Sequence, residues 1–462
     1  MHGTGGGVNL LALRSHNAAL VLDLLRTAGA DGISRLELAE RTGLTPQAVS
    51  KITARLREDG LAAEAGRRAS TGGKPRTVLR LVPEAGHAVG VHLDRDEVRV
   101  VLVDLRGTVV GERRAPLDLG AGASAVLTAV TGAVRETVAG VLPAGPFAGP
   151  GVGEARSAGA GAAQASGSMP LAGPGSPLGA GGVREAVGEA RSSGSRSARD
   201  AAAHASGSMP LTRPGSPLGA EGVRDAAVHG LDSVPLAGPG PGPGSLIGVG
   251  VALPGPLDHA RGVLHRVTGF PEWDGFPLRE ALAERLGVPV VVDKDTNAAA
   301  LGLAAGGEGG SFAYLHLGTG LGAGLVIGGS VHRGARTGAG EFGHQVIQLD
   351  GPPCTCGDRG CVEALCLDAV ARGDTAEAAR VLGAGAANLV GLLDIDVVLL
   401  GGRTVATAPE AFVRGVGTVL EAWARRTGQE AVPVRVAAGG GGVVAVGAAQ
   451  MVLGPVFGRG GG

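Results

Sequence analysis

The feature that most limits how this chain can fold is a long central segment with no pattern able to build a core. Between Pro143 and Gly244 there is no Ile, Trp or Tyr, and Phe147 is the only aromatic residue. The segment also repeats itself, because residues 165–185 and 205–225 agree at 17 of 21 positions. Two copies of a Gly/Pro/Ser unit without apolar periodicity cannot bury a core, which excludes a solenoid. We expect residues 143–245 to be a disordered, low-complexity insert rich in Gly, Pro and Ala.

The insert leaves two parts of the chain to fold, and the first is a helical head over residues 1–82. A first run of apolar residues at helical spacing predicts one helix. Ser34 and Glu37 follow it, and their spacing is that of a capping box at the start of a second helix. Thr45 followed by Pro46 is typical of the start of a third helix. Two helices joined by a short turn that contains Gly follow the helix-turn-helix plan. Two strands are predicted beyond the third helix, around a flexible basic tip, and they would form the wing of a winged helix-turn-helix domain.

The charge of this head points to nucleic acid. Residues 1–82 carry 12 Lys and Arg against 7 Asp and Glu, a net charge of +5, whereas the remaining residues carry −6. A basic head on an acidic body suggests a polyanion partner for the head alone. The third helix would point its polar face into the major groove, and wing cations would reach phosphates or a minor groove. The residues expected to contact double-stranded DNA are Gln47, Ser50, Lys51, Arg67, Arg68, Lys74 and Arg76. The alternative is a helical oligomerisation module with a solvated basic loop.

The second part is an α/β body made of residues 83–142 and 246–462. Strand patterns fill residues 88–110, a helix pattern fills 123–141, and helix and strand patterns alternate from 246 to the end, which indicates a mostly parallel sheet. No run of about 20 apolar residues is present, so no transmembrane helix is expected. The first residues lack the basic and apolar regions of a secretory signal. We therefore expect a cytoplasmic protein with no membrane partner.

The four cysteines all lie between residues 354 and 366, which makes a poor disulfide framework and a good metal cluster. One imidazole and three thiolates suit tetrahedral zinc and leave no position open for water, so the predicted site is structural. Its candidate ligands are His344, Cys354, Cys356 and Cys361. Cys366 falls in a helix pattern and is assigned to packing. The alternative is a loop with incidental reduced thiols.

Other chemical patterns are ambiguous when each is taken alone. Residues 315–329 show a strand, a Gly-rich turn and a strand; such a turn lets backbone amides approach an anion, but it is equally typical of a tight hairpin. Asp295 ends a buried strand, where α/β ligand sites form, and it can serve as a general base or simply as a helix cap. Glu341 and Glu363 flank the cysteine cluster. A polyol is held by several carboxylates and an imidazole together, so the combination suggests a sugar.

Taken in this order, the motifs resemble the ROK family, the repressors, open reading frames and kinases of bacterial sugar metabolism. The specific signature is EFGH at 341–344 followed by CTCGDRGCVE at 354–363, and GTGLGAG, DKDTN and VVLLGG support it. The resemblance covers roughly residues 10–142 and 246–462, and the chain is similar to sugar repressors of the xylose and N-acetylglucosamine type. It implies a winged helix-turn-helix domain and a two-lobed actin-like, or ribonuclease H-like ATPase, sugar-kinase fold that the insert interrupts.

The resemblance also assigns roles to residues. The family's sugar contacts fall on Glu341, His344 and Glu363, and its zinc ligands fall on the His/Cys set named above. Its catalytic Asp falls on Asp295, which we expect to be vestigial as a catalyst and to contact the sugar. The Asn that usually precedes this Asp is replaced by Lys294. The segment after Glu363 is shorter than usual, which implies a missing helical element and, with it, part of a dimer surface.

The decisive departure from the family's kinases lies at the first nucleotide loop. Those kinases carry an Asp-x-Gly-Gly-Thr turn that holds the ATP phosphates, whereas this chain reads GVHLDRDEV at 90–98. His92 replaces the Asp, Asp94 and Arg95 replace the glycines, and Asp96 replaces the Thr. One like-charge pair at about 4 Å costs about 4 kcal/mol at an effective dielectric constant of about 20. We expect ATP binding to be lost or much weakened, and the chain not to be an enzyme.

The sequence therefore predicts a cytoplasmic, sugar-responsive transcriptional repressor of carbohydrate uptake or catabolism genes. As a homodimer or homotetramer it would bind a double-stranded DNA operator and leave it when a monosaccharide or sugar phosphate binds, with structural zinc as cofactor. One alternative is an ATP-dependent, glucokinase-like sugar kinase that carries a DNA-binding domain. The other is a repressor that senses no sugar and responds to a protein partner.

Overall fold

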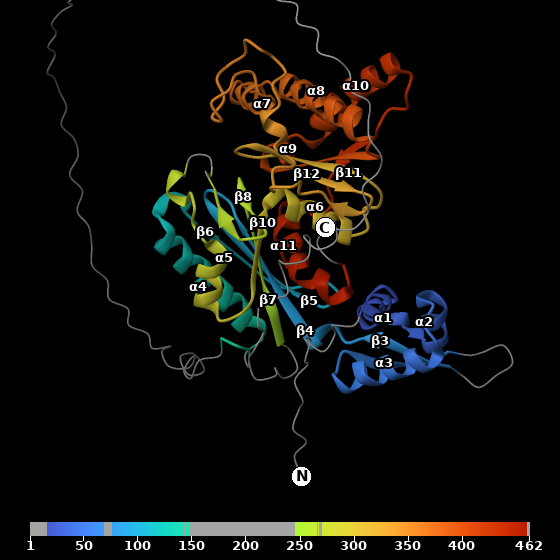
Figure 1. Cartoon of the computed structure of the whole chain (residues 1–462). Helices are drawn as coiled ribbons and strands as arrows, with labels where there is room; N and C mark the ends of the chain where they lie inside the picture. The colour runs from blue at the N-terminus through green and yellow to red at the C-terminus, as the bar shows by residue number, and fades with distance from the viewer. Residues whose placement is uncertain are drawn as a thin grey trace, which may run out of the picture. The chain divides into compact units, whose positions relative to one another are not determined.

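The computed structural model describes residues 16–68, 76–142, 145–147, 245–265, 267 and 270–459. The expected insert at 143–245 and the tip of the wing lie almost entirely outside these described residues, so neither expectation is tested. A helical head and an α/β body of two sheets are formed by the described residues (Figure 1).

The head has the predicted winged helix-turn-helix plan. Its elements are α1 (His16–Thr27), β1 (Ile33–Ser34), α2 (Arg35–Thr42), α3 (Pro46–Glu58), β2 (Ala62–Arg68) and β3 (Arg76–Leu81). The capping box is present, because the Glu37 amide donates to Ser34 Oγ and the Ser34 amide donates to the Glu37 carboxylate. Thr45 caps α3 by accepting from the Ala48 amide. The strand order β1-β3-β2 makes β2 and β3 the wing.

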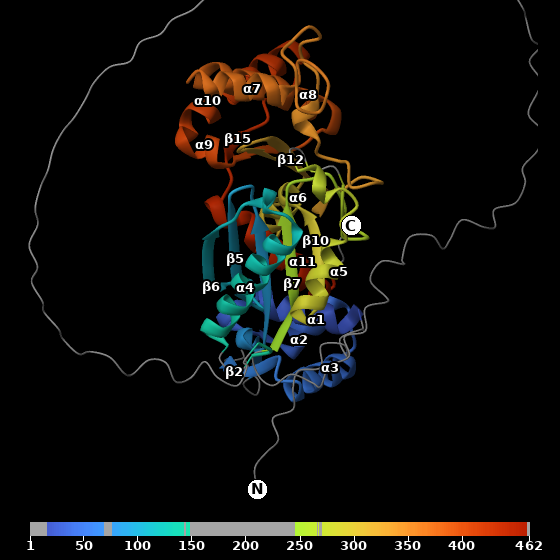
Figure 2. The same ribbon diagram turned by 90° about the vertical axis from the view of Figure 1, so that its left-hand side faces the viewer.

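The first half of the body is a five-stranded sheet of order β10-β7-β4-β5-β6. Its elements are β4 (Gly86–Leu93), β5 (Glu97–Asp104), β6 (Val109–Pro116), α4 (Ala123–Val141), β7 (Ser245–Leu253), α5 (Leu278–Leu286) and β10 (Val290–Lys294). A small β8 (Leu257–Asp258) and β9 (Val263–Leu264) ribbon follows β7. Figure 2 shows α4 and α5 over one face of this sheet, where their apolar residues and the strands form one core.

The second half is a five-stranded sheet of order β13-β12-β11-β14-β15. Its elements are α6 (Asp295–Ala305), β11 (Phe312–Leu317), β12 (Leu321–Ile327), β13 (Ser330–Val331), α7 (Val362–Ala371), α8 (Thr375–Leu393), β14 (Val397–Gly401), α9 (Arg403–Thr407), α10 (Pro409–Thr427), β15 (Val434–Val436) and α11 (Val443–Leu453). The helices α7, α8 and α10 cover one face and share a core with the strands.

The sheets differ from the mostly parallel arrangement that we predicted. β10, β7 and β4 are parallel, as are β11, β14 and β15, but the hairpins β4–β5–β6 and β11–β12–β13 are antiparallel. Each sheet is therefore mixed. The reason is that short links such as residues 94–96 and 318–320 join neighbouring strands directly, whereas a parallel pair needs a long crossover.

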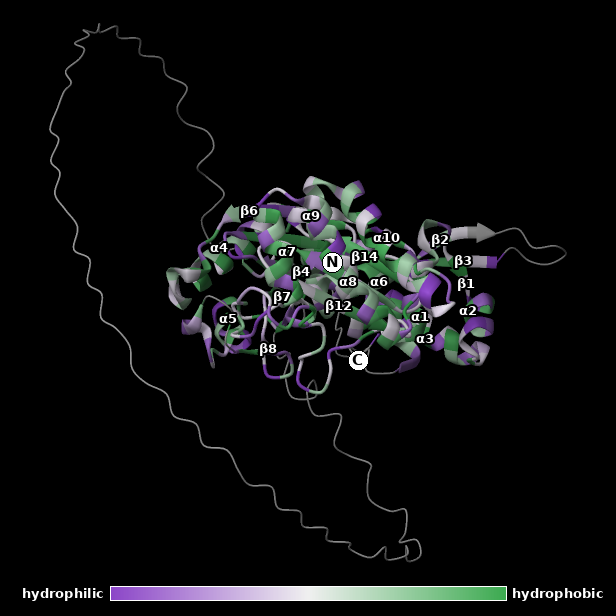
Figure 3. Cartoon of the chain, turned by 90° about the horizontal axis from the view of Figure 1, so that it is seen from above, coloured by the Kyte–Doolittle hydropathy of each residue, from purple (hydrophilic) through white to green (hydrophobic). Residues whose placement is uncertain are grey.

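Two helical stretches in the described chain, Thr375–Leu393 and Gly440–Phe457, are long and apolar enough to cross a membrane by length and composition alone. Half of each is buried inside the fold, as expected of core helices. In Figure 3 the hydrophobic colour likewise collects on interior elements such as α6 and β14.

The helices α6 and α11 pack directly on each other, between the two sheets (Figure 1). Small residues allow this contact, since a Cβ added at Gly447 of α11 would lie 1.7 Å from the Ala298 carbonyl oxygen of α6. The backbones of the two helices therefore touch. Close-packed interiors transmit strain, so we expect a shift of α6 to be passed on to α11.

We expect Gly447→Ala to destabilise the fold by about 3 kcal/mol, the upper end of the usual cost of overpacking, because the added methyl group meets backbone and not a flexible side chain. The matched control is Gly417→Ala on α10, where a Cβ would have no neighbour within 4 Å. Ala is the better helix former, so this control is expected to add up to about 1 kcal/mol. Urea unfolding of both variants measures the two effects, and equal stabilities would contradict the contact.

Candidate functional site

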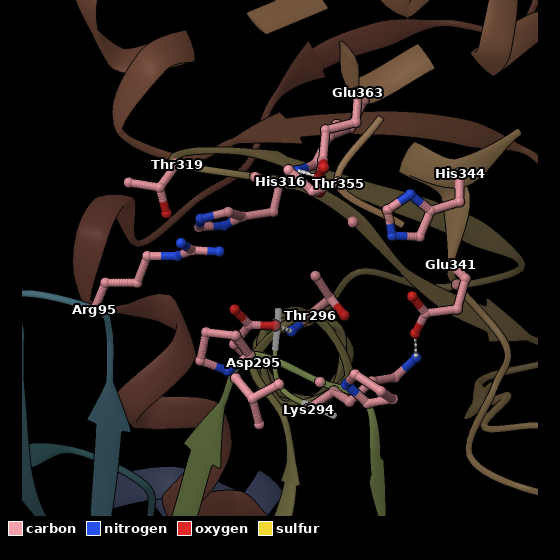
Figure 4. Close-up of a pocket in the computed structure, with 18 of the residues that line it drawn as sticks. Arg95, Lys294, Asp295, Thr296, His316, Thr319, Glu341, His344, Thr355 and Glu363 are labelled. Atoms are coloured by element: carbon pink, nitrogen blue, oxygen red, sulfur yellow. Dashed lines mark hydrogen bonds and ion pairs between the residues drawn. The ribbon is translucent and has the colours of Figure 1, made fainter. Parts of the chain in front are cut away.

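A cavity of about 590 Å³ lies between the two halves of the body, and it draws its lining from both (Figure 4). The four residues expected to contact a sugar, Asp295, Glu341, His344 and Glu363, all line it. They come from the start of α6, from the loop after β13 and from the first turn of α7. The structure thus brings together residues that are up to 68 positions apart in the chain. Their role as sugar contacts stays a prediction.

Asp295 is held at the floor of the cavity by a buried network beneath it. The Asp293 carboxylate, with 2% of its surface exposed, accepts from Arg333 Nε at 2.6 Å and from Asn297 Nδ2 at 2.8 Å. This network fixes the junction between β10 and α6. Asp295 is therefore the first residue of α6, and its carboxylate accepts the Thr296 amide at 2.7 Å. The N-cap position of α6 belongs to Lys294, and no side chain makes a cap hydrogen bond there, so the alternative that Asp295 is simply a helix cap is wrong.

Lys294 occupies the position where the family resemblance places an Asn. Its side chain is buried, and Nζ donates to the Ala339 carbonyl at 2.5 Å and to Glu341 Oε1 at 3.0 Å. Figure 4 shows this ion pair at the edge of the cavity, with the second Glu341 oxygen directed away from Lys294. Glu341 therefore keeps one oxygen for a ligand, and Lys294 offers a donor where an Asn would offer both a donor and an acceptor.

The predicted metal ligands lie together beside the cavity. The ligand atoms of His344, Cys354, Cys356 and Cys361 are all within 4.8 Å of one another. Cys354 Sγ is 3.6 Å from His344 Nδ1, and Cys356 Sγ is 3.7 Å from Cys361 Sγ. A tetrahedron with Zn–S bonds of about 2.3 Å has edges of about 3.8 Å between sulfurs, whereas a disulfide needs about 2.05 Å. The spacing fits a tetrahedral metal ion.

The electrostatics of the cluster favour a bound cation as well. Burial and the adjacent thiols of Cys354 and Cys356 raise the pKa of Cys361 to about 12. Three thiolates packed this closely need a positive charge between them, and a coordinated metal ion supplies it. Cys366 lies apart, fully buried in the core with its Sγ 3.5 Å from the Ala378 carbonyl, in agreement with its assignment to packing.

The His/Cys cluster is directly connected to two cavity residues. His344 turns Nδ1 toward Cys354, so the remainder of its ring is left for the cavity (Figure 4). Cys361 is the N-cap of α7, and Glu363 follows in the first turn of that helix. Glu363 Oε2 accepts the Leu321 amide at 2.7 Å, which joins α7 to the glycine-rich turn between β11 and β12.

The turn between β4 and β5 carries the residues that replace the kinase loop. Asp94 and Asp96 are paired with the Arg403 guanidinium, at 2.7 Å and 3.1 Å. The like-charge repulsion that we expected from the sequence is therefore offset by a cation that sequence reasoning missed. Burial lowers the pKa of His92 to about 4 despite the Asp295 and Asp94 carboxylates nearby, so this ring is neutral at pH 7.

The predicted DNA-contacting residues of the third helix lie on its open face. Gln47, Ser50 and Lys51 are exposed, while Val49 and Leu56 are buried against the rest of the head. Arg76, at the start of β3, is exposed as well. Lys74 and the side chains of Arg67 and Arg68 lie outside the described residues, so their predicted contacts stay predictions.

Several residues of the cavity were not found from the sequence. They are Arg95 and His316, which point toward the cavity beside Thr319 (Figure 4), and the supporting pair Asp293 and Arg333. Asp293 lies in β10, and its partner Arg333 lies 40 residues further along the chain. Such partners lie on different elements and leave no local pattern.

Comparisons with known proteins agree with this architecture. Residues 241–370 match the ROK family, and residues 21–62 match a winged helix-turn-helix DNA-binding domain. The xylose repressor of Caldicellulosiruptor bescii is 36% identical over 121 residues, which are 26% of this chain and 30% of that protein. The glucokinase of Thermotoga maritima is 41% identical over 121 residues, 25% of this chain and 38% of that protein. The chain thus matches well under two thirds of the length of these curated relatives.

The fold has a solved counterpart over nearly its full length. The crystal structure of a ROK family transcriptional regulator, a homologue of the E. coli MLC protein, aligns with 96% of this chain and 98% of that one. The TM-score is 0.63 and the sequence identity is 17%. This likeness shows the fold: a winged helix-turn-helix head followed by a two-sheet α/β body.

Proposed function

Because the chain carries a ROK family domain behind an N-terminal winged helix-turn-helix domain, we propose that it is a sugar-responsive transcriptional repressor. The observation that supports this most directly is the pairing of an exposed polar face on α3 with a cavity lined by carboxylates and an imidazole. A protein that reads an operator needs the first feature, and one that senses a polyol needs the second. It would work in the cytoplasm, without a membrane partner, and as a homodimer or homotetramer on paired half-sites.

The effector that suits the cavity is a monosaccharide or sugar phosphate. Asp295, Glu341 and Glu363 supply acceptors for hydroxyl groups, while His344 supplies a ring nitrogen that the metal cluster orients. A structural zinc ion held by His344 and the three clustered cysteines would fix the positions of His344 and Glu363. In this proposal Asp295 is a sugar contact, and no catalytic step is assigned to it.

Contacts between head and body offer a route from the cavity to DNA. The helix α6 starts at Asp295 in the cavity and packs on α11, which leads directly into residues Gly454–Phe457. The Phe457 ring lies 4.8 Å below the Arg26 guanidinium carbon of α1. Arg459 pairs with Asp23 of α1 at 3.1 Å. A sugar that favours one arrangement of α6 and α11 would therefore bias the placement of the head, and only its differential affinity for the two arrangements matters.

The second candidate function is a sugar kinase with a DNA-binding head. It is favoured by the retained glycine-rich turn at 318–320, by Asp295 at the cavity floor and by the glucokinase relative. It is disfavoured by the β4–β5 turn, where Asp94 and Asp96 occupy positions that would face a triphosphate. We propose that ATP binding is lost or much weakened.

One experiment separates these functions. The purified protein selects operator fragments from genomic DNA, and the selected fragment is titrated with D-xylose, D-glucose and their phosphates. We expect at least one sugar to lower operator affinity by about 5- to 150-fold, the range of ordinary allosteric coupling. ADP release with the same sugars is expected to stay at the level of Asp295→Asn. Turnover at ordinary kinase rates that Asp295→Asn abolishes would support the kinase, and operator release by no sugar would favour a repressor that responds to a protein partner.

A further inference from the structure

An ion-pair cluster joins the two halves of the body beside the cavity. Arg403 Nη2 donates to Asp94 Oδ2 at 2.7 Å and to Asp96 Oδ1 at 3.1 Å, and Nη1 donates to Asp96 Oδ2 at 3.1 Å. The contact with Asp96 is thus bidentate, the strongest geometry available to an Arg and a carboxylate. Asp94 and Asp96 follow β4 in the first half, whereas Arg403 begins α9 after β14 in the second half.

Both sides of this contact are anchored to their own half. The Asp94 amide donates to the Glu97 carbonyl at 2.9 Å, and the Asp94 carboxylate accepts the Arg95 amide at 2.8 Å, which closes the turn. On the other side, Thr404 Oγ1 donates to the Gly318 carbonyl at 3.1 Å and ties α9 to the glycine-rich turn. The guanidinium and the carboxylates are therefore presented by backbone segments that hydrogen bonds already hold in place.

The three side chains are charged and partly open to water. The hydrogen bond from Arg403 lowers the pKa of Asp96, and the hydrogen bond to Asp96 raises the pKa of Arg403. Arg403 is 44% exposed and Asp94 is 25% exposed. The attraction therefore has modest strength and is sensitive to salt, because exposed charges are screened over about 3 Å at 1 M ionic strength. A contact of this strength can hold the two halves of the body in one arrangement and can still be broken.

We propose that Arg403, Asp94 and Asp96 form a latch that holds the two halves of the body in one arrangement and so regulates the response of the cavity between them. Asp94 lines the cavity itself, and opening the cavity along this side requires the latch to break. The latch also gives the acidic turn a role, since Asp94 and Asp96 both pair with Arg403 of the other half. The regulatory role rests on the proposed function, whereas the latch itself does not.

Hydrogen exchange of the full chain, without sugar or DNA, tests the latch. In Arg403→Gln we expect exchange to rise three- to tenfold in the β4–β5 turn and also in cavity-lining segments such as residues 294–297 and 340–344, because the halves separate more often. The matched control is Arg414→Gln on α10, whose ion pair with Glu410 lies within one helix and is 72% exposed on the Arg side. The control is expected to match the wild type, and the wild type in 1 M NaCl is expected to approach Arg403→Gln.

A charge reversal sharpens the test. Arg403→Glu alone should raise exchange at least as much as Arg403→Gln, and combining it with Asp94→Lys and Asp96→Lys should restore the wild-type pattern within twofold. Exchange that rises only at residues 94–97 and 403–407, or that does not rise at all, would overturn the latch, whether or not the triple variant folds. Failure of every sugar to bind would instead contradict the proposed function and would leave the exchange result unaffected.

Discussion

Replacement of Cys361 by Ser is expected to empty the metal site and to weaken sugar binding about 100-fold, while operator binding stays within a few-fold of the wild type. Cys361 is both a predicted metal ligand and the N-cap of α7. Ser is a preferred N-cap residue, so the helix keeps its start and the change acts on the cluster. Without the metal ion, His344 and Glu363 lose the loop that positions them, and losses of 10- to 100-fold are typical when the support of a single ligating group is removed.

Two measurements check this expectation. Elemental analysis of the purified protein should give one zinc per wild-type chain and almost none in Cys361→Ser. Calorimetry with the sugar that releases the operator gives the change in affinity. Cys366→Ser is the matched control, because Cys366 is a buried thiol outside the cluster whose neighbour, the Ala378 carbonyl, can accept from a hydroxyl. A zinc-free Cys361→Ser protein with normal sugar affinity would contradict the positioning role of the cluster.

The parts of this fold that could be predicted from the sequence are those with local signals. The capping box at Ser34 and Glu37 and the Thr45-Pro46 start of α3 were confirmed because a cap is made within one helical turn. The helix at residues 123–141 was predicted at the bounds it has in the structure. The sheets were predicted as mostly parallel because alternating helices and strands suggest crossover connections. In the structure, antiparallel hairpins contribute several strand pairs to each sheet, which this pattern does not indicate.

The candidate site likewise has some features that a local sequence pattern indicates and others that it does not. The gathering of His344 with the three cysteines was predictable, since at most 17 residues separate the ligands and soft sulfur donors select one kind of chemistry. The partner of Lys294 lies 47 residues away, and the partner of Asp96 lies 307 residues away. Pairs at such separations are created by the packing of the two halves, and no pattern in a single sequence indicates them. For the same reason, the sequence indicated the repulsion between the acidic residues of the β4–β5 turn but not their attraction to Arg403.

Lys51→Ala is expected to weaken operator binding by about 10- to 100-fold. The residue lies on the exposed face of α3, where the fold places a recognition helix, and its ammonium group would reach a guanine or a phosphate. A good base contact is worth about 1–3 kcal/mol. Loss of a phosphate contact would in addition reduce the slope of log affinity against log salt by about 0.9. Fluorescence anisotropy with a labelled operator at several salt concentrations measures both quantities.

The pattern of the losses distinguishes contact with DNA from a general effect of charge. Arg426→Ala removes an exposed positive charge from α10 in the body, and it is expected to change operator affinity less than twofold. Gln47→Ala should weaken binding to the operator more than binding to random DNA, because an amide reads a base edge. Lys51→Ala should weaken both if its contact is a phosphate, and chiefly the operator if its contact is a base. Equal affinities for wild type and Lys51→Ala would mean that another surface of the head meets DNA, since a recognition helix cannot lose its central cation without cost.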